Sequence, residues 1–175
     1  MQVKRKGEEH IELDHPEKLT SAIVQALWNE SITGEMTREC IQTLREFGIP
    51  EDQIIHKNVP GSFELPLGAQ LIENSHHPDA IICLGCVIKG ETDHDVFINQ
   101  GITHALMNLN LRYGKPFVFG VLTVNTEEQA ILRSNGKKGN KGKEAAEAAL
   151  HMLTLKNTLK SETNPGIGFR SGKKI

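Results

Sequence analysis

The sequence has few aromatic residues, few cysteines and no long hydrophobic run. Six Phe, one Trp and one Tyr are its only aromatic residues, so we expect a core of aliphatic side chains. Three cysteines are too few for a disulfide framework in 175 residues. No stretch approaches the roughly 18 apolar residues of a membrane-spanning helix. The basic start, residues 1–6, leads into Glu8 and Glu9 instead of an apolar signal segment, so we expect a cytoplasmic protein.

The chain also lacks an excess of charge of either sign. Lys and Arg number 20 against 22 Asp and Glu, a formal net charge of −2, which excludes a strongly basic nucleic-acid-binding protein. The length suits one domain that buries its own core. We expect an N-terminal arm over residues 1–20, a single domain over 21–160 and a flexible tail rich in Gly, Ser and Lys over 161–175.

Short aliphatic runs alternate with longer segments of helical period. The runs predict strands at residues 22–27, 53–59, 80–88 and 117–123. The periodic segments predict helices at residues 32–47, 62–74, 93–113, 126–133 and 143–160. We expect Ser62 to cap the second helix, and Thr126 with Gln129 to form a capping box on the fourth. This alternation predicts an α/β fold, a parallel sheet with right-handed crossovers and helices on both faces.

The carboxyl ends of parallel strands meet at one edge of a sheet, where ligands bind. The expected strands deliver to this edge residues 28–29, 60–64, 86–94 and 123–125. Residues 85–92 (GCVIKGET) approach a P-loop pattern, but Glu91 stands where that loop needs a lysine for the phosphates. We therefore exclude a nucleoside triphosphate site, while the N–H groups of Glu91 and Thr92 still suit a monophosphate.

His94 falls in the first turn of the expected third helix. The helix dipole there disfavours the imidazolium form, whereas the neighbours Asp93 and Asp95 favour it. Such opposed influences suit proton transfer near neutral pH; the alternative is a surface histidine at a helix start. Cys83 and Cys86 form a C-x-x-C pattern, but residues three apart on a strand point to opposite faces, so we expect core packing and no metal.

The main basic cluster is the Gly/Lys loop, residues 136–142, with Arg133 one turn before it. It favours the attraction of a phosphorylated substrate; the alternative is a solvated loop. No aromatic residue is interleaved with its lysines, which argues against nucleic acid.

Four motifs in this order resemble the 6,7-dimethyl-8-ribityllumazine synthase family. They are residues 59–66 (VPGSFELP), 85–94 (GCVIKGETDH), 119–123 (FGVLT) and 126–142 (TEEQAILRSNGKKGNKG). The resemblance implies a three-layer αβα sandwich around a four-stranded parallel sheet with flavodoxin-like winding. It also implies an enzyme of riboflavin biosynthesis, a transferase of the penultimate step. That enzyme condenses 5-amino-6-(D-ribitylamino)uracil with 3,4-dihydroxy-2-butanone 4-phosphate, releases phosphate and water, and needs no cofactor or metal.

The resemblance also implies roles for individual residues. Those that would bind the ribitylaminouracil are Trp28, Ser62, Phe63, Glu64, Cys86, Val87 and Ile88, with Phe119 from a neighbouring subunit. Those that would bind the phosphate are Glu91, Thr92, Arg133 and Lys141. Trp28 would stack on the pyrimidine and His94 would transfer protons. The implied assembly is a homo-oligomer with active sites at subunit interfaces, a pentamer or a hollow icosahedral shell of sixty chains, and it allows riboflavin synthase as a partner.

Two positions depart from the family pattern. Relatives usually place an aromatic residue and then an acid after the histidine, whereas this chain has Asp95, Val96 and Phe97. Lys138 stands where many relatives have a histidine. The extra carboxylate beside His94 is expected to shift the pH optimum or to weaken activity. Two alternatives therefore stay open: a protein that binds flavins or ribityl compounds with little catalysis, and a shell-forming scaffold.

Overall fold

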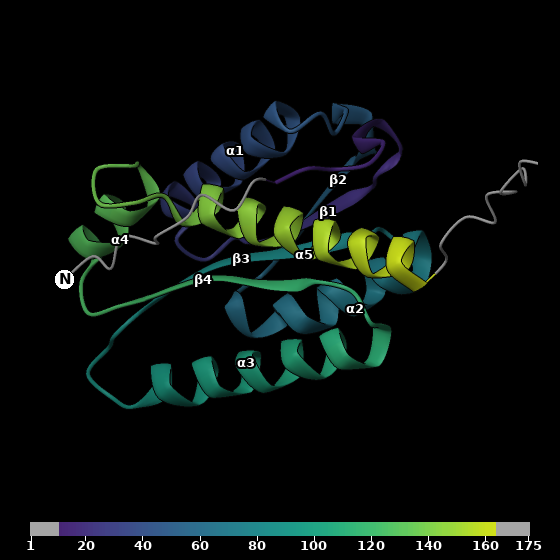
Figure 1. Cartoon of the computed structure of the whole chain (residues 1–175). Coiled ribbons are helices and arrows are strands. Elements are labelled where there is room, and N and C mark those ends of the chain that lie inside the picture. Colours follow the sequence, from purple (N-terminus) through teal and green to yellow (C-terminus); the bar gives the residue numbers. More distant parts are fainter. Residues whose placement is uncertain (1–10, 164–175) are drawn as a thin grey trace, which may run out of the picture.

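A computed structural model describes residues 11–163 of the chain. A four-stranded parallel sheet lies at its centre, between layers of helices (Figure 1). Its strands are β1 (Ser21–Ala26), β2 (Ile54–Val59), β3 (Ala80–Ile88) and β4 (Phe117–Val124). They lie in the order β2-β1-β3-β4. Along β1, Ser21 faces Ile54 of β2 on one side and Ala80 of β3 on the other. This order confirms the predicted α/β fold with flavodoxin-like winding.

Helices cover both faces of the sheet. They are α1 (Glu30–Glu46), α2 (Leu65–His76), α3 (His94–Tyr113), α4 (Glu127–Ser134) and α5 (Lys141–Thr163). Three short 3-10 turns complete the order: η1 (Pro16–Lys18), η2 (Glu51–Gln53) and η3 (Ser62–Glu64). In Figure 1, α1 and α5 lie over one face of the sheet, and α2 and α3 lie over the other. Within residues 11–163, no helix is long and apolar enough to cross a membrane.

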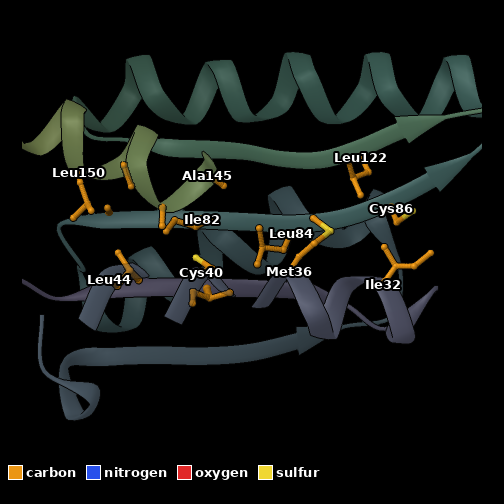
Figure 2. Close-up of a cluster of buried hydrophobic side chains, with 14 of the residues drawn as sticks. Ile32, Met36, Cys40, Leu44, Ile82, Leu84, Cys86, Leu122, Ala145 and Leu150 are labelled. Atoms are coloured by element: carbon orange, nitrogen blue, oxygen red, sulfur yellow. The ribbon is translucent and has the colours of Figure 1, made fainter. Parts of the chain in front are cut away.

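Each face of the sheet buries its own aliphatic cluster, because successive side chains of a strand point in opposite directions. Ile82, Leu84 and Cys86 of β3 pack against α1 and α5 (Figure 2). Ile81 and Cys83 pack with residues of α2 and α3 on the other face. Cys83 and Cys86 therefore point apart, as predicted. Among the described residues no group of His, Cys, Asp and Glu could hold a metal ion.

The expected helix cap at Ser62 is wrong. Ser62 begins the 3-10 turn η3 instead, where the N–H of Glu64 donates to the carbonyl of Gly61 at 3.2 Å. The α-helix α2 begins only at Leu65, and no side chain caps it. The Ser62 hydroxyl is buried and has no hydrogen-bond partner in the described structure. The hydroxyl therefore does not cap a backbone N–H group at the start of α2.

The last helix begins two residues earlier than expected, at Lys141. Asn140 is the reason, because its Oδ1 accepts from the N–H groups of Gly142 at 3.0 Å and Lys143 at 3.1 Å, as a helix-capping side chain does. Gly142 also lies against α1, where a Cβ at this position would come within 1.9 Å of the Met36 carbonyl oxygen. The two helices on this face therefore touch through their backbones.

A buried ion pair between Lys115 and Glu73 lies at the amino edge of the sheet. The Lys115 ammonium, just before β4, lies 2.9 Å from both carboxylate oxygens of Glu73 on α2 and 2.8 Å from the Pro78 carbonyl before β3. Their side chains are only 13% and 5% exposed. The pair links three segments that are far apart in the sequence.

The expected arm and tail are described only in part. Ile11, Leu13 and Leu19 pack against the cluster between the sheet and α1, so this part of the arm joins the core. The helix α5 continues through Thr163, past the expected boundary at residue 160. The predictions for residues 1–10 and 164–175 lie outside the described residues.

Candidate active site

A cleft of about 470 Å³ opens at the carboxyl edge of the sheet, between the segments that follow β1, β2 and β3. Nine residues that the family resemblance implicates line it: Trp28, Ser62, Phe63, Glu64, Cys86, Val87, Ile88, Thr92 and His94. They come from separate parts of the sequence and meet because parallel strands end at the same edge. The cleft therefore matches the predicted position of a ligand site.

Trp28 projects from the turn between β1 and α1 with 72% of its surface exposed. Its backbone N–H donates to the Pro60 carbonyl at 3.1 Å, which ties this turn to the end of β2. The next residue, Asn29, adopts a left-handed backbone (φ 63°) and its amide donates to the Cys86 carbonyl at 3.1 Å. The sequence places Asn29 at this edge but indicates no role for it; the one available signal is that asparagine tolerates this conformation better than most residues.

The turn η3 forms a second wall of the cleft. Phe63 is 63% exposed, and its Cε2 lies 3.5 Å from where a Cβ at Gly101 of α3 would be, so the ring leans on that helix. Ser62 lies beneath, against β3, where a Cβ at Gly85 would come within 2.6 Å of its hydroxyl oxygen. Glycine at position 85 therefore makes the room in which Ser62 sits.

The β3–α3 segment forms the third wall. Thr92 and His94 line the cleft at the start of α3, and both are exposed. The first N–H groups of a helix lack partners within it and favour a bound anion. Glu91 is exposed and does not line the cleft with its side chain. The geometry thus places the start of a helix beside a histidine; phosphate binding and proton transfer at this place stay predictions.

Cys86 lies in this cleft with an unreactive thiol. Burial, and secondarily the nearby Glu127 carboxylate, raise its pKa to about 11. A thiol is nucleophilic only as the thiolate, so Cys86 contributes shape and a backbone carbonyl instead of covalent chemistry.

Besides Glu91, three of the implicated residues do not line this cleft within the chain. Phe119 lies on β4 opposite Cys83 and packs partly buried on the α2–α3 side. Arg133 is exposed in the last turn of α4. Lys141 begins α5, and its ammonium lies 3.8 Å from the Glu144 carboxylate. The cleft of one chain is therefore lined by most of the residues predicted to bind the heterocycle, and by no arginine or lysine among the described residues.

A model of the 6,7-dimethyl-8-ribityllumazine synthase family matches residues 18–157, which include the whole sheet and all residues of the cleft. The chain belongs to this family. A lumazine synthase of Cytophaga hutchinsonii is 50% identical over 131 residues, which cover 75% of this chain and 82% of that protein. Lumazine synthases of Bacteroides fragilis and Flavobacterium psychrophilum are 46% and 42% identical, covering 75% and 87% of this chain and 92% and 78% of theirs.

In this member of the lumazine synthase family, the departure after His94 falls inside the cleft. Asp95 is the second residue of α3 and lines the cleft beside Ile98. Val96 and Phe97 are exposed on the same helix, at 43% and 71%, and do not line it. Of the three unusual residues, Asp95 is therefore the one that can meet a ligand.

Proposed function

We propose that this chain catalyses the lumazine synthase reaction, the condensation of 5-amino-6-(D-ribitylamino)uracil with 3,4-dihydroxy-2-butanone 4-phosphate. The observation that carries the proposal is the cleft, which brings together Trp28, the η3 turn and His94 from three strand ends. Membership of the family supports the substrates and the product, 6,7-dimethyl-8-ribityllumazine. The relatives described above are lumazine synthases, which agrees with this activity.

The cleft residues suit the steps of this reaction. The exposed face of Trp28 offers a stacking platform for the pyrimidine, and Ser62 and Glu64 offer hydrogen-bonding groups for the ribityl chain. The 5-amino group of one substrate attacks the ketone of the other, and water leaves as the imine forms. Phosphate is then eliminated, and ring closure releases a second water. Each step moves protons, which His94 at the cleft wall can accept and return.

The phosphate side of the site would be completed by a second copy of the chain. Arg133, Lys141 and Phe119 do not line the cleft of their own chain. The outer surfaces of α2 and α3 expose large apolar side chains that a monomer would leave in water: Leu67, Leu71, Phe97, Met107 and Leu111. The proposal therefore includes a homo-oligomer with interfacial active sites, a pentamer or a sixty-chain shell, located in the cytoplasm and open to riboflavin synthase as a partner.

A two-substrate assay tests the proposal. The purified protein is mixed with both substrates, and product is followed by the absorbance and fluorescence of the lumazine while released phosphate is measured in parallel. We expect lumazine and phosphate to form in equal amounts, at a rate proportional to protein concentration and absent with denatured protein. Tight binding of the ribitylaminouracil without product would favour the ligand-binding alternative. Light scattering of the same sample tests the assembly, and a monomer would contradict the shared site.

A further inference from the structure

Asp95 has a carboxylate oxygen that is buried in the cleft wall and has no partner. Its Oδ1 is shielded from solvent and makes no hydrogen bond within the described residues. A charged oxygen removed from water without a donor costs free energy, because the lost hydration is not replaced. The residue lines the cleft. The side chain as a whole is only partly buried, so a rotation of the carboxylate toward the cleft would let a donor group on a bound molecule satisfy this acceptor.

The turn η3, another wall of the cleft, also carries acidic or unpartnered polar side chains. The turn η3 packs against α3, with Phe63 resting near Gly101. Ser62 is the other cleft-lining residue with a buried, unpartnered side-chain oxygen. Glu64 adds a second carboxylate to the cleft, and within the described chain no Lys or Arg lines it. This part of the cleft thus offers acceptors and a hydroxyl, and its negative charge disfavours a phosphate.

We propose that Asp95 is a specificity-determining residue that accepts a hydrogen bond from a hydroxyl of the ribityl chain. The inference rests on the proposed function and adds a residue for its polyol substrate. A polyol is neutral and carries a donor on each hydroxylated carbon, so it matches a surface of acceptors. A direct effect of the Asp95 carboxylate on proton transfer by His94 explains the geometry less well, because consecutive side chains of a helix do not face each other.

The test compares two unreactive probes that differ only in the chain. The first is 6-(D-ribitylamino)uracil, which lacks the attacking amine, and the second is 6-(pentylamino)uracil, which lacks the hydroxyls. Binding is followed by the fluorescence of Trp28, the sole tryptophan, which lies in the cleft. We expect Asp95→Ala to raise the Kd of the ribityl probe about 10- to 100-fold, as loss of a charge-assisted hydrogen bond does. The Kd of the pentyl probe should stay unchanged. Asp95→Asn keeps an acceptor oxygen and the shape of the side chain, so it should raise the Kd of the ribityl probe less than Asp95→Ala does.

Asp93→Asn is the matched control, since it removes one negative charge from the same helix end but lies outside the cleft. It should bind both probes as the unaltered protein does. In steady-state assays, Asp95→Ala should raise KM for the ribitylaminouracil and leave KM for the butanone phosphate unchanged. Equal weakening of both probes, or the same effect from Asp93→Asn, would overturn the inference.

The two proposals fail in different ways. A wild-type protein that forms no lumazine refutes the proposed function. Lumazine formation with unaltered discrimination between the probes in both Asp95 variants refutes only the role of Asp95. Thermal unfolding of each variant shows whether it is folded, and if Asp95→Ala is not, the nearly isosteric Asp95→Asn decides.

Discussion

Replacing Trp28 by alanine should weaken binding of the pyrimidine substrate and hardly change the stability of the fold. The side chain is 72% exposed, so less than a third of its surface is withdrawn from water within the chain. Full burial of a large apolar side chain contributes about 1.5–3 kcal/mol, so the free energy of unfolding should fall by less than about 1 kcal/mol. The backbone hydrogen bond from Trp28 to Pro60 does not depend on the side chain and should persist.

The effect on binding should be larger than the effect on stability. Stacking of a base on an aromatic side chain contributes about 1–3 kcal/mol, so KM for the ribitylaminouracil should rise about 5- to 150-fold. Trp28→Phe keeps an aromatic face, so its KM for the ribitylaminouracil should rise less than that of Trp28→Ala. KM for the butanone phosphate should stay constant, because that substrate has no ring to stack.

The assay is lumazine formation at varied concentrations of each substrate, with thermal unfolding measured on the same samples. A Trp28→Ala protein with unchanged KM for the ribitylaminouracil would refute the stacking role. A loss of several kcal/mol in unfolding free energy would refute the inference that the side chain is free of the core. A pentameric or larger assembly that falls apart on substitution would show that Trp28 packs at an interface instead.

Three further predictions concern catalysis and packing. His94→Ala should lower kcat/KM about 10²- to 10⁴-fold in the lumazine assay, with the assembly unchanged, because an exposed histidine contributes proton transfer and little packing. Lys115→Met should lower the free energy of unfolding by about 3–5 kcal/mol in denaturant titration, because it removes the lysine ammonium from the buried Glu73 carboxylate and leaves it beside the exposed ring of His77, whose Nδ1 lies 3.5 Å away. Gly142→Ala should destabilise the fold by about 1–3 kcal/mol or more in the same titration, because the added methyl group meets the Met36 carbonyl.

Each of these predictions has a control that can contradict it. Full activity of His94→Ala would remove its assigned role. The double variant Glu73→Gln with Lys115→Met should recover much of the stability that the single variant loses, and no recovery would argue against the ion pair as the cause. Gly34→Ala tests the glycine argument, since that helical position has its nearest neighbour at 3.8 Å. It should be neutral or slightly stabilising, and a loss equal to that of Gly142→Ala would contradict the close-approach explanation.

Much of the fold could be predicted because burial leaves a strong pattern in the sequence. The strand β3 is apolar along almost its whole length and has the predicted bounds, Ala80–Ile88. Helix starts were harder to predict, because competing local hydrogen bonds decide them. Because Asn140 caps it, α5 begins two residues earlier than expected. Ser62 begins the 3-10 turn that follows Gly61 and so does not cap α2.

The site could be predicted at the level of strand ends, and less well at the level of side-chain environment. Parallel topology alone brings Trp28, η3 and the start of α3 to one edge. The open acceptor of Asp95 depends on how α3 is rotated against the sheet, which no local pattern records. The left-handed backbone at Asn29 is likewise visible only in three dimensions. The roles of the residues in the cleft, and of Arg133, Lys141 and Phe119 beyond it, stay predictions.

The strand order has a consequence for how the chain folds during synthesis. Of the described strands, β1 is the first to leave the ribosome. It becomes an interior strand and must wait for β3, whose Ala80 pairs with Ser21, before both of its edges are occupied. Pairing across such a separation is slow compared with local hairpin formation. The strand made in between, β2, carries exposed His56, Lys57 and Asn58 at its middle. Polar side chains on this edge strand discourage its free edge from pairing with other nascent chains.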